Sequence, residues 1–254
     1  MQLLLYVLAG ITVLYIIVQW VRIIYYGRVS DRLIAKAVVV DNYPNDPDRR
    51  ILIIGDSLWV GVGASDSADS LAGRLIEDLP DAQVINQAQS GARISDGLAQ
   101  LEAAAAEHGA FHQIIIQLGA NDIVNFTPLA RATRDLQVLL KRASELAPDV
   151  AYMVSGSVGF APVFWRPLDW FYTAVSRRYL KAFSAVSRAV GVLYIDFFRE
   201  RKVDPFYGQP EKFYAADKFH PSGAGYGLWY ERCQENLQCF AYDQKQPQTI
   251  EEIT

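Results

Sequence analysis

Apolar residues along this chain follow two different spacings. Short runs rich in apolar residues occupy residues 51–54, 82–85, 111–118, 150–155 and 192–197. Between them lie stretches in which apolar residues recur every three or four positions, at residues 66–79, 94–108, 128–146, 168–190 and 225–240. Runs of the first kind are typical of strands buried on both faces, and the second spacing is typical of helices. The pattern therefore predicts strands that alternate with helices.

This alternation predicts an α/β fold in which βαβ units with right-handed crossovers build a five-stranded parallel sheet. Five strands suit the order 2-1-3-4-5 of flavodoxin-like folds. In that order the first strand lies between the second and the third, so the loops after all three open at one edge of the sheet. We expect residues 50–242 to form this domain, with a juxtamembrane connector at 27–49 and a polar tail at 243–254.

The N-terminal segment has no charged residue at positions 3–21 and is rich in Leu, Ile, Val and Tyr. As a helix it would be about 28 Å long, close to the roughly 30 Å hydrocarbon core of a bilayer. A signal peptide would need a basic start, a shorter apolar stretch and a small-residue cleavage site, and none is evident. We predict an uncleaved, single-pass transmembrane anchor at 1–26. Gly27 would interrupt it, and a short helix at 30–37 would follow with Ser30 as its N-cap.

Basic residues indicate how this anchor is oriented. Arg22, Arg28, Arg32 and Lys36 all follow the apolar span, and only the chain terminus precedes it. The positive-inside tendency therefore predicts that the body of the protein is cytoplasmic. Because a single span with so short a tail is a weak case for that rule, an extracytoplasmic location remains the alternative.

Composition narrows the range of partners. The 254 residues carry a net charge of −4 with both signs interspersed, so no basic surface for nucleic acid is evident. The only cysteines are Cys233 and Cys239, and three histidines in all do not provide a zinc-type cluster. We expect neither a metal nor a cofactor. Two packed thiols are expected, a Cys233–Cys239 pair stays open, and the sequence does not determine the oligomeric state.

Residues with useful chemistry follow several of the predicted strands. Ser57 comes directly after the first strand, in G-D-S-L. Gly91 lies in the loop after the second strand, and Asn121 lies in G-A-N-D after the third. Asp217 and His220 lie in D-K-F-H, between the fifth strand and the last helix. Residues three apart in a helical turn share a face, so Asp217 can reach the imidazole of His220. All of these segments are expected at the sheet edge where open α/β sheets bind ligands.

The chemistry of these residue types indicates nucleophilic catalysis by serine. His220, held in the useful tautomer by Asp217, would remove the Ser57 proton and later protonate the leaving group. The oxyanion that develops needs donors that are fixed beforehand. The backbone N–H groups of Ser57 and Gly91 and the side-chain amide of Asn121 are the candidates.

Four sequence blocks, in this order, resemble those of the SGNH (GDSL) hydrolase family. They are G-D-S-L at 55–58, the loop with Gly91, G-A-N-D at 119–122 and D-K-F-H at 217–220. One such motif is a weak signal, whereas four in order are a strong one. The resemblance spans about residues 50–240 and implies a three-layer α/β/α flavodoxin-like fold and ester or thioester hydrolysis without a metal. It also implies a catalytic set of Ser57, Asp217 and His220, with Ser57, Gly91 and Asn121 as the oxyanion hole.

Other polar residues near these blocks are interpreted as structural. Asp56 and Asp122 are expected to order loops as hydrogen-bond acceptors. His108 ends a predicted helix and His112 begins a predicted strand, so we expect both to serve the fold.

Residues 156–172 are dense in aromatic side chains. They could form an apolar rim that binds acyl chains or rests on a bilayer, because aromatic rings suit both surroundings. They could equally serve only to cover the sheet. Together with the anchor, this segment favours a lipid or acyl-chain ester over a soluble sugar ester.

The sequence thus predicts a membrane-anchored serine esterase or lipase-like hydrolase that forms an acyl-enzyme with a small-molecule or lipid ester. Two alternatives stay open. An acyltransferase would use the same site with a hydroxyl acceptor in place of water. A non-catalytic, membrane-tethered module would use the same crevice only for binding.

Overall fold

A single five-stranded parallel sheet forms the centre of the computed structural model, which describes residues 1–236. Its strands are β1 (Arg49–Gly55), β2 (Ala82–Asn86), β3 (Gln113–Gln117), β4 (Asp149–Val154) and β5 (Leu193–Asp196). They lie in the order β2-β1-β3-β4-β5, and each neighbouring pair is parallel. The predicted strand order is therefore confirmed.

The central strand β1 is buried on both faces. Leu52 and Ile54 point into one apolar cluster, and Ile51 and Ile53 point into the other. All four are fully buried. Alternate residues of a strand face opposite sides, so an unbroken apolar run is what a strand between two helical layers requires.

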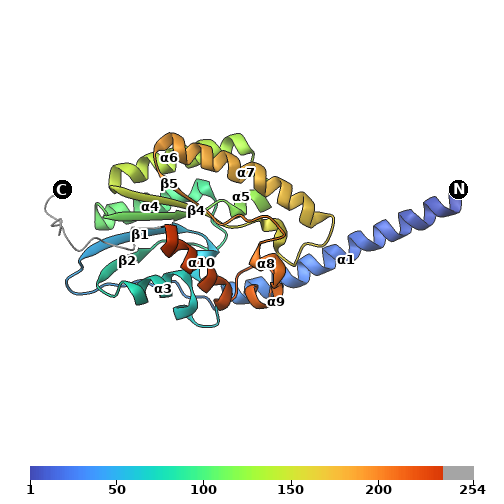
Figure 1. The fold of residues 1–254 in the computed structure, drawn as a ribbon, viewed down its shortest axis with the longest axis horizontal. Coiled ribbons are helices and arrows are strands. Elements are labelled where there is room, and N and C mark those ends of the chain that lie inside the picture. Colours follow the sequence, from blue (N-terminus) through green and yellow to red (C-terminus); the bar gives the residue numbers. More distant parts are fainter. Residues whose placement is uncertain (237–254) are drawn as a thin grey trace.

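Helices cover both faces of the sheet and give three layers (Figure 1). On one face lie α4 (Ile94–His108), α6 (Leu129–Leu146) and α7 (Leu168–Val190), which pack through one cluster with Leu52 and Ile54. On the other lie α3 (Leu71–Asp78) and α10 (Gly223–Asn236). Short helices occupy the loops at the carboxyl edge of the sheet: α2 (Ser57–Val60), α5 (Ala120–Val124), α8 (Pro205–Gly208) and α9 (Pro210–Phe213). Two 3₁₀ turns, η1 (Ser67–Asp69) and η2 (Val158–Phe160), complete the set.

The first helix, α1 (Gln2–Ile34), is longer than predicted. Gly27 does not interrupt it, and Ser30 lies inside the helix, so the predicted separate helix at 30–37 with a Ser30 cap is wrong. A single glycine lowers helix stability only modestly, and tertiary contacts of the second half of α1 can offset that cost. Figure 1 shows the N-terminal part of α1 projecting far from the rest of the protein.

Two other predicted helices differ from the structure at their ends. The predicted helix at 66–79 is divided into η1 and α3, because the Ser70 side chain accepts a hydrogen bond from the Gly73 N–H and begins a new helix. The last helix begins at Gly223, and its predicted end near residue 240 lies outside the described residues. Cys233 is buried in the core, whereas Cys239 and the predicted tail also lie outside the described residues.

The turn between η1 and α3 leaves no room for a side chain at Gly73. A Cβ there would lie 2.2 Å from the Ser67 carbonyl oxygen and 2.7 Å from the Ala68 Cα. Replacing a helical glycine by alanine normally stabilises a protein by up to about 1 kcal/mol. Here we expect Gly73→Ala to lower the free energy of unfolding by about 1–3 kcal/mol, because backbone atoms must shift. Urea unfolding of the detergent-solubilised protein measures the change, and a gain in stability would contradict the packing described.

Candidate active site

The turn after β1 is held by hydrogen bonds from three directions. The Gln100 side chain accepts from the Gly55 N–H at 3.0 Å and donates to the Gly55 carbonyl at 3.1 Å. The Asp56 carboxylate accepts from the Leu58 N–H at 3.0 Å and so caps α2. The Asn86 side chain donates to the Trp59 carbonyl at 2.9 Å. These contacts fix Ser57, the first residue of α2, at the carboxyl end of the central strand.

Ser57, His220 and Asp217 lie in a row. Ser57 Oγ is 2.9 Å from His220 Nε2, and His220 Nδ1 is 2.5 Å from Asp217 Oδ2. All three residues are buried, and Asp217 is completely so. Segments 163 residues apart in the sequence therefore place a hydroxyl, an imidazole and a carboxylate within hydrogen-bonding distance of one another.

The segment from Asp217 to His220 is an irregular turn, so the predicted helical turn is wrong. Lys218 has a φ of +58°, which a right-handed helix does not contain. The Asp217 carboxylate instead accepts hydrogen bonds from the N–H groups of Phe219 and His220, at 3.1 and 3.0 Å. This turn curls around the carboxylate and brings it to the imidazole as the sequence spacing suggested.

Two opposing effects act on the Asp217 carboxyl. Burial disfavours its charged form, but its hydrogen bond to His220 and the His220 charge outweigh burial and lower the pKa below the ordinary value. Asp217 therefore stays ionised at neutral pH. An ionised acceptor next to Nδ1 favours the tautomer that carries its proton there, which leaves Nε2 to accept from Ser57.

Gly91 and Asn121 lie on the two loops beside Ser57. Gly91 has a φ of +84°, a conformation that favours glycine and turns the loop after β2. The Asn121 amide donates to the Ala92 carbonyl at 2.9 Å and faces Asp56 Oδ2 at 3.5 Å. Within the described part of the chain, the N–H groups of Ser57 and Gly91 have no hydrogen-bond acceptor. The two predicted backbone donors are thus unoccupied, whereas one Asn121 N–H is engaged.

Asp122 ties these two loops together. Its carboxylate accepts from the Ile94 N–H at 2.9 Å, so the segment that follows Gly91 is bound to the helix that carries Asn121. This agrees with the interpretation of Asp122 as a loop-ordering acceptor, and Asp56 acts in the same way at α2. His112 also serves the fold, because its Nδ1 accepts from the Arg50 N–H at 2.9 Å.

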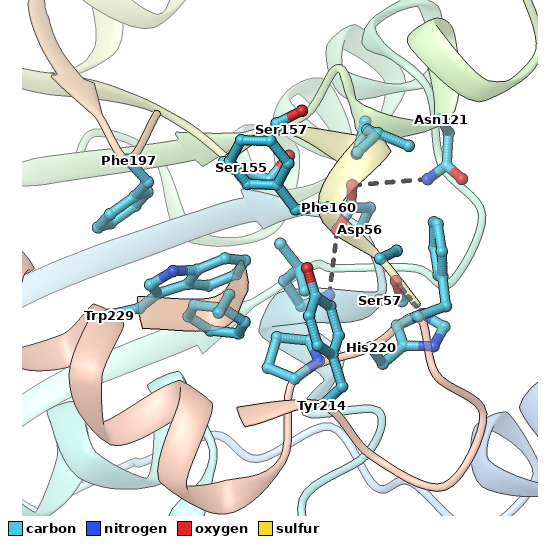
Figure 2. Close-up of a pocket in the computed structure, with 18 of the residues that line it drawn as sticks. Asp56, Ser57, Asn121, Ser155, Ser157, Phe160, Phe197, Tyr214, His220 and Trp229 are labelled. Atoms are coloured by element: carbon cyan, nitrogen blue, oxygen red, sulfur yellow. Dashed lines mark hydrogen bonds between the residues drawn. The ribbon is translucent and has the colours of Figure 1, made fainter. Parts of the chain in front are cut away.

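A solvent-open cleft of about 640 Å³ extends from Ser57 across the carboxyl ends of β4 and β5. Figure 2 shows Ser57 and His220 at one end of it, with Phe197 and Trp229 at the other. Between them lie Phe160 and Tyr214, and Ser155 and Ser157 also line the cleft. The lining is therefore mainly apolar, and the buried Asp204 carboxyl adds a polar group at the end formed by Phe197, Phe206 and Trp229.

Sequence reasoning missed the part of this cleft that comes from α8, α9 and α10. Phe206, Tyr214 and Trp229 line it, and Phe206 lies 5.2 Å from Tyr214 and 5.0 Å from Trp229 between ring centroids. The available signal was the pair Pro205 and Pro210, each at the first turn of a short helix and each followed by aromatic residues.

Comparison with known families now decides the class of this protein. The model of the GDSL-like lipase/acylhydrolase family matches residues 53–228. The chain belongs to this family. Membership makes the protein an enzyme that hydrolyses ester bonds, as its sequence blocks predicted. No functionally curated protein matches the chain.

Solved structures share the fold of this GDSL-like protein. A psychrotrophic esterase, EstA, from Pseudoalteromonas sp. superposes with a TM-score of 0.59 at 20% identity, over 76% of this chain and 98% of its own. TesA superposes with a TM-score of 0.56 at 21% identity, over 76% and 99%. An acetylxylan esterase from Geobacillus stearothermophilus gives 0.55 at 16% identity, over 78% and 96%. At these identities the likeness establishes the three-layer fold.

The pH dependence of stability tests whether the Asp56 carboxyl is buried away from water. Burial raises the pKa of Asp56 to about 6, from an ordinary value of 3.8. Between these pH values the native state keeps a proton that the unfolded chain releases, so stability should fall as pH rises. The total loss is roughly 3 kcal/mol, at about 1.4 kcal/mol per pKa unit. We expect the free energy of unfolding of Asp56→Asn to lack this fall when unfolding is measured from pH 4 to 7.

The informative quantity is the difference in unfolding free energy between the variant and the original protein at each pH. That difference removes the contributions of all other titrating groups, which the two proteins share. A difference that stays constant across the range would show that Asp56 is not held in a dry environment.

Proposed function

We propose that the protein hydrolyses carboxylic esters through an acyl-enzyme intermediate, with Ser57 as nucleophile, His220 as general base and acid, and Asp217 as the group that orients His220. The observation that carries this proposal is the continuous row of contacts, 2.9 Å from Ser57 Oγ to His220 Nε2 and 2.5 Å from His220 Nδ1 to Asp217 Oδ2. A positioned base is what a serine hydroxyl needs to become an effective nucleophile.

In the first step Ser57 Oγ forms a bond to the ester carbonyl carbon while its proton passes to His220 Nε2. The carbon–oxygen bond to the alcohol then breaks, and His220 returns the proton to the departing alcohol oxygen. In the second step His220 takes a proton from a water molecule, which attacks the acyl-enzyme. Collapse of that intermediate releases the carboxylic acid, and the proton returns to Ser57.

The charge that develops on the carbonyl oxygen requires donors aimed at it beforehand. The unoccupied N–H groups of Ser57 and Gly91 support their assignment as two of these donors. For Asn121, the N–H that faces Asp56 at the long distance of 3.5 Å is the one available to the substrate, because the other donates to Ala92 at 2.9 Å.

The mainly apolar lining of the cleft supports binding of the acyl group of the ester. Aromatic rings of Phe197, Phe206 and Trp229 line the end away from Ser57. Burying an acyl chain against them gains about 25 cal/mol for each Å² of apolar surface removed from water. The alcohol portion of the ester then faces the open side, from which water enters in the second step.

Substitution of the proposed triad provides the direct test. We expect Ser57→Ala and His220→Ala each to lower kcat/KM for short and long p-nitrophenyl esters by at least about 10,000-fold, and the double variant to lose little more, because the residues act as a unit. His108→Gln is the matched control, since this histidine lies at the end of α4, and it should keep its activity.

A fluorophosphonate probe gives a second readout that does not depend on choosing the right ester. It should label the original protein and the control at Ser57 but not the Ser57→Ala variant. Equal esterase rates in the original and Ser57→Ala proteins would remove Ser57 from the mechanism.

We also propose that α1 stays attached as a membrane anchor with the catalytic domain in the cytoplasm. Among the described residues α1 is the one helix long and apolar enough to cross a bilayer, and its residues 2–14 are all exposed. The basic residues that follow the span support this orientation. A green fluorescent protein fused after Thr254 should fluoresce, whereas an alkaline phosphatase fusion there should stay inactive. The opposite pair of results would place the domain on the other side.

A further inference from the structure

The second half of α1 is packed on the catalytic domain along one stripe. Its buried and half-buried positions are Tyr15, Gln19, Arg22, Ile23, Tyr26, Val29, Ser30 and Leu33. They recur at intervals of three to four residues, which places them on one face of a helix. The first half has no such stripe, because residues 1–14 are exposed all around. The helix therefore has a projecting part and a docked part.

Polar side chains of the docked part bind one loop of the domain. Only 3% of the Gln19 surface is accessible to solvent. Its side-chain amide donates a hydrogen bond to the Val163 carbonyl at 3.0 Å. Arg22 donates to the Pro162 carbonyl at 2.6 Å, and its guanidinium lies 4.4 Å from the centre of the Trp165 ring. A glutamine and an arginine at the end of an apolar span thus have specific partners on the loop at 162–165.

This docking restricts where the loop can lie relative to a bilayer. The projecting residues 3–14 extend only about 18 Å as a helix, well short of the roughly 30 Å hydrocarbon core. The remaining length must come from residues beside the loop, and Tyr15 already contacts it, with its hydroxyl 3.4 Å from the Trp165 carbonyl. With α1 crossing the bilayer as proposed above, the loop at 162–165 lies at the membrane interface.

Large aromatic residues are exposed next to this loop. Trp165, Trp170, Phe171 and Phe126, named here the aromatic patch, expose 44, 56, 50 and 49% of their surfaces. Phe126 and Phe171 lie 5.8 Å apart between ring centroids, and Arg166 lies over the Trp170 ring at 5.0 Å. Exposed aromatic and basic residues in this combination are typical of surfaces at the lipid headgroup level.

A continuous row of rings leads from the patch to the candidate triad. Phe171 lies 5.6 Å from Tyr172, Tyr172 lies 4.4 Å from Phe164, and Phe164 lies 6.3 Å from Phe219. Phe219 in turn lies 5.2 Å from the His220 ring. The α1 helix also reaches this point, because Ser30 Oγ is 3.5 Å from His220 Nδ1.

We propose that docked α1 and the aromatic patch form one membrane-binding surface that holds the Ser57 end of the cleft close to the bilayer interface, and that the substrate is a lipid ester drawn directly from the leaflet. The second half of this inference rests on the ester hydrolysis proposed above, whereas the first half does not. The helix then acts as a rigid mount and not as a flexible tether, because its contacts fix the distance and angle between the bilayer and Ser57.

Quenching of tryptophan fluorescence tests the membrane-binding surface without any catalysis. The full-length Ser57→Ala protein is reconstituted in phosphatidylcholine vesicles with and without bromine on the upper acyl chains. Removing a tryptophan in contact with lipid lowers the fraction of intensity that bromine quenches, and removing one away from lipid raises it. We expect Trp170→Phe to lower this fraction and Trp229→Phe, which removes a ring stacked on Phe197, to raise it. A quenched fraction that is unchanged or higher in Trp170→Phe would overturn the proposed surface.

Gln19→Leu separates docking from anchoring. The substitution keeps the helix apolar enough to insert but removes the shorter of two hydrogen bonds to the Val163 carbonyl, the other coming from Arg22 Nε at 3.4 Å. We expect Trp170 to be quenched less in this variant, although flotation shows that the protein is still in the vesicles. Undiminished quenching of Trp170 would show that the docked helix does not set the position of the patch.

Substrate presentation tests the origin of the ester. Rates are measured for a long-chain fluorogenic ester embedded in the same vesicles and for a short, water-soluble p-nitrophenyl ester. The ratio of the first rate to the second should fall at least tenfold in a Trp170→Ser, Phe171→Ser double variant. It should stay within twofold in Tyr43→Ser, which alters another exposed aromatic residue, beside His108.

The outcomes distinguish the two proposals. An unchanged ratio in the patch variant, with hydrolysis still dependent on Ser57, would overturn uptake from the leaflet and leave the proposed esterase intact. If Ser57→Ala hydrolyses both esters as fast as the original protein, the proposed function fails, and the bromine experiment still decides whether the patch lies on the membrane.

Discussion

Parallel pairing of β1 with both β2 and β3 is the constraint on which the rest of this structure depends. Because the three strands run in the same direction, their carboxyl ends meet at one edge of the sheet. The turns that carry Ser57, Gly91 and Asn121 leave from that edge, although they are separated by 34 and 30 residues in the chain. Only a strand that is apolar on both faces can occupy this central position. The position of Ser57 therefore depends on the apolar run of β1.

Burial of charge at this edge requires that every carboxylate has assigned partners. Asp217 has none of its surface exposed and accepts hydrogen bonds from two backbone N–H groups besides facing His220. Asp56 is nearly as buried, but it has one backbone donor at 3.0 Å and two side-chain amides only at 3.5 Å. The pKa values differ accordingly, lowered for Asp217 and raised for Asp56. The ionised Asp217 carboxylate thus faces the His220 ring, and the Asp56 carboxyl orders the turn that carries Ser57.

The N-terminal helix shows how a candidate membrane span can also pack against a folded domain. Gln19 and Arg22 are costly to bury in hydrocarbon but donate hydrogen bonds to carbonyl groups of the loop at 162–165, so in the proposed arrangement they lie where α1 leaves the lipid. The same loop precedes α7 and approaches the candidate site through Phe164 and Phe219. A change in the angle of α1 would therefore move side chains that lie close to His220.

Sequence alone determined the α/β class, the strand order, the family and the identity of the candidate residues, because these depend on local apolar spacing and on short motifs. It also marked α1 as a candidate span. Only the tertiary structure decided how far α1 continues, that Asp217 and His220 meet in an irregular turn, and that Phe206, Tyr214 and Trp229 complete the cleft. The physical reason is the same in each case. Docking of a helix stripe, the curl of a turn around a buried carboxylate and the closing of an apolar cleft all depend on contacts between residues far apart in the chain, and no local pattern records them.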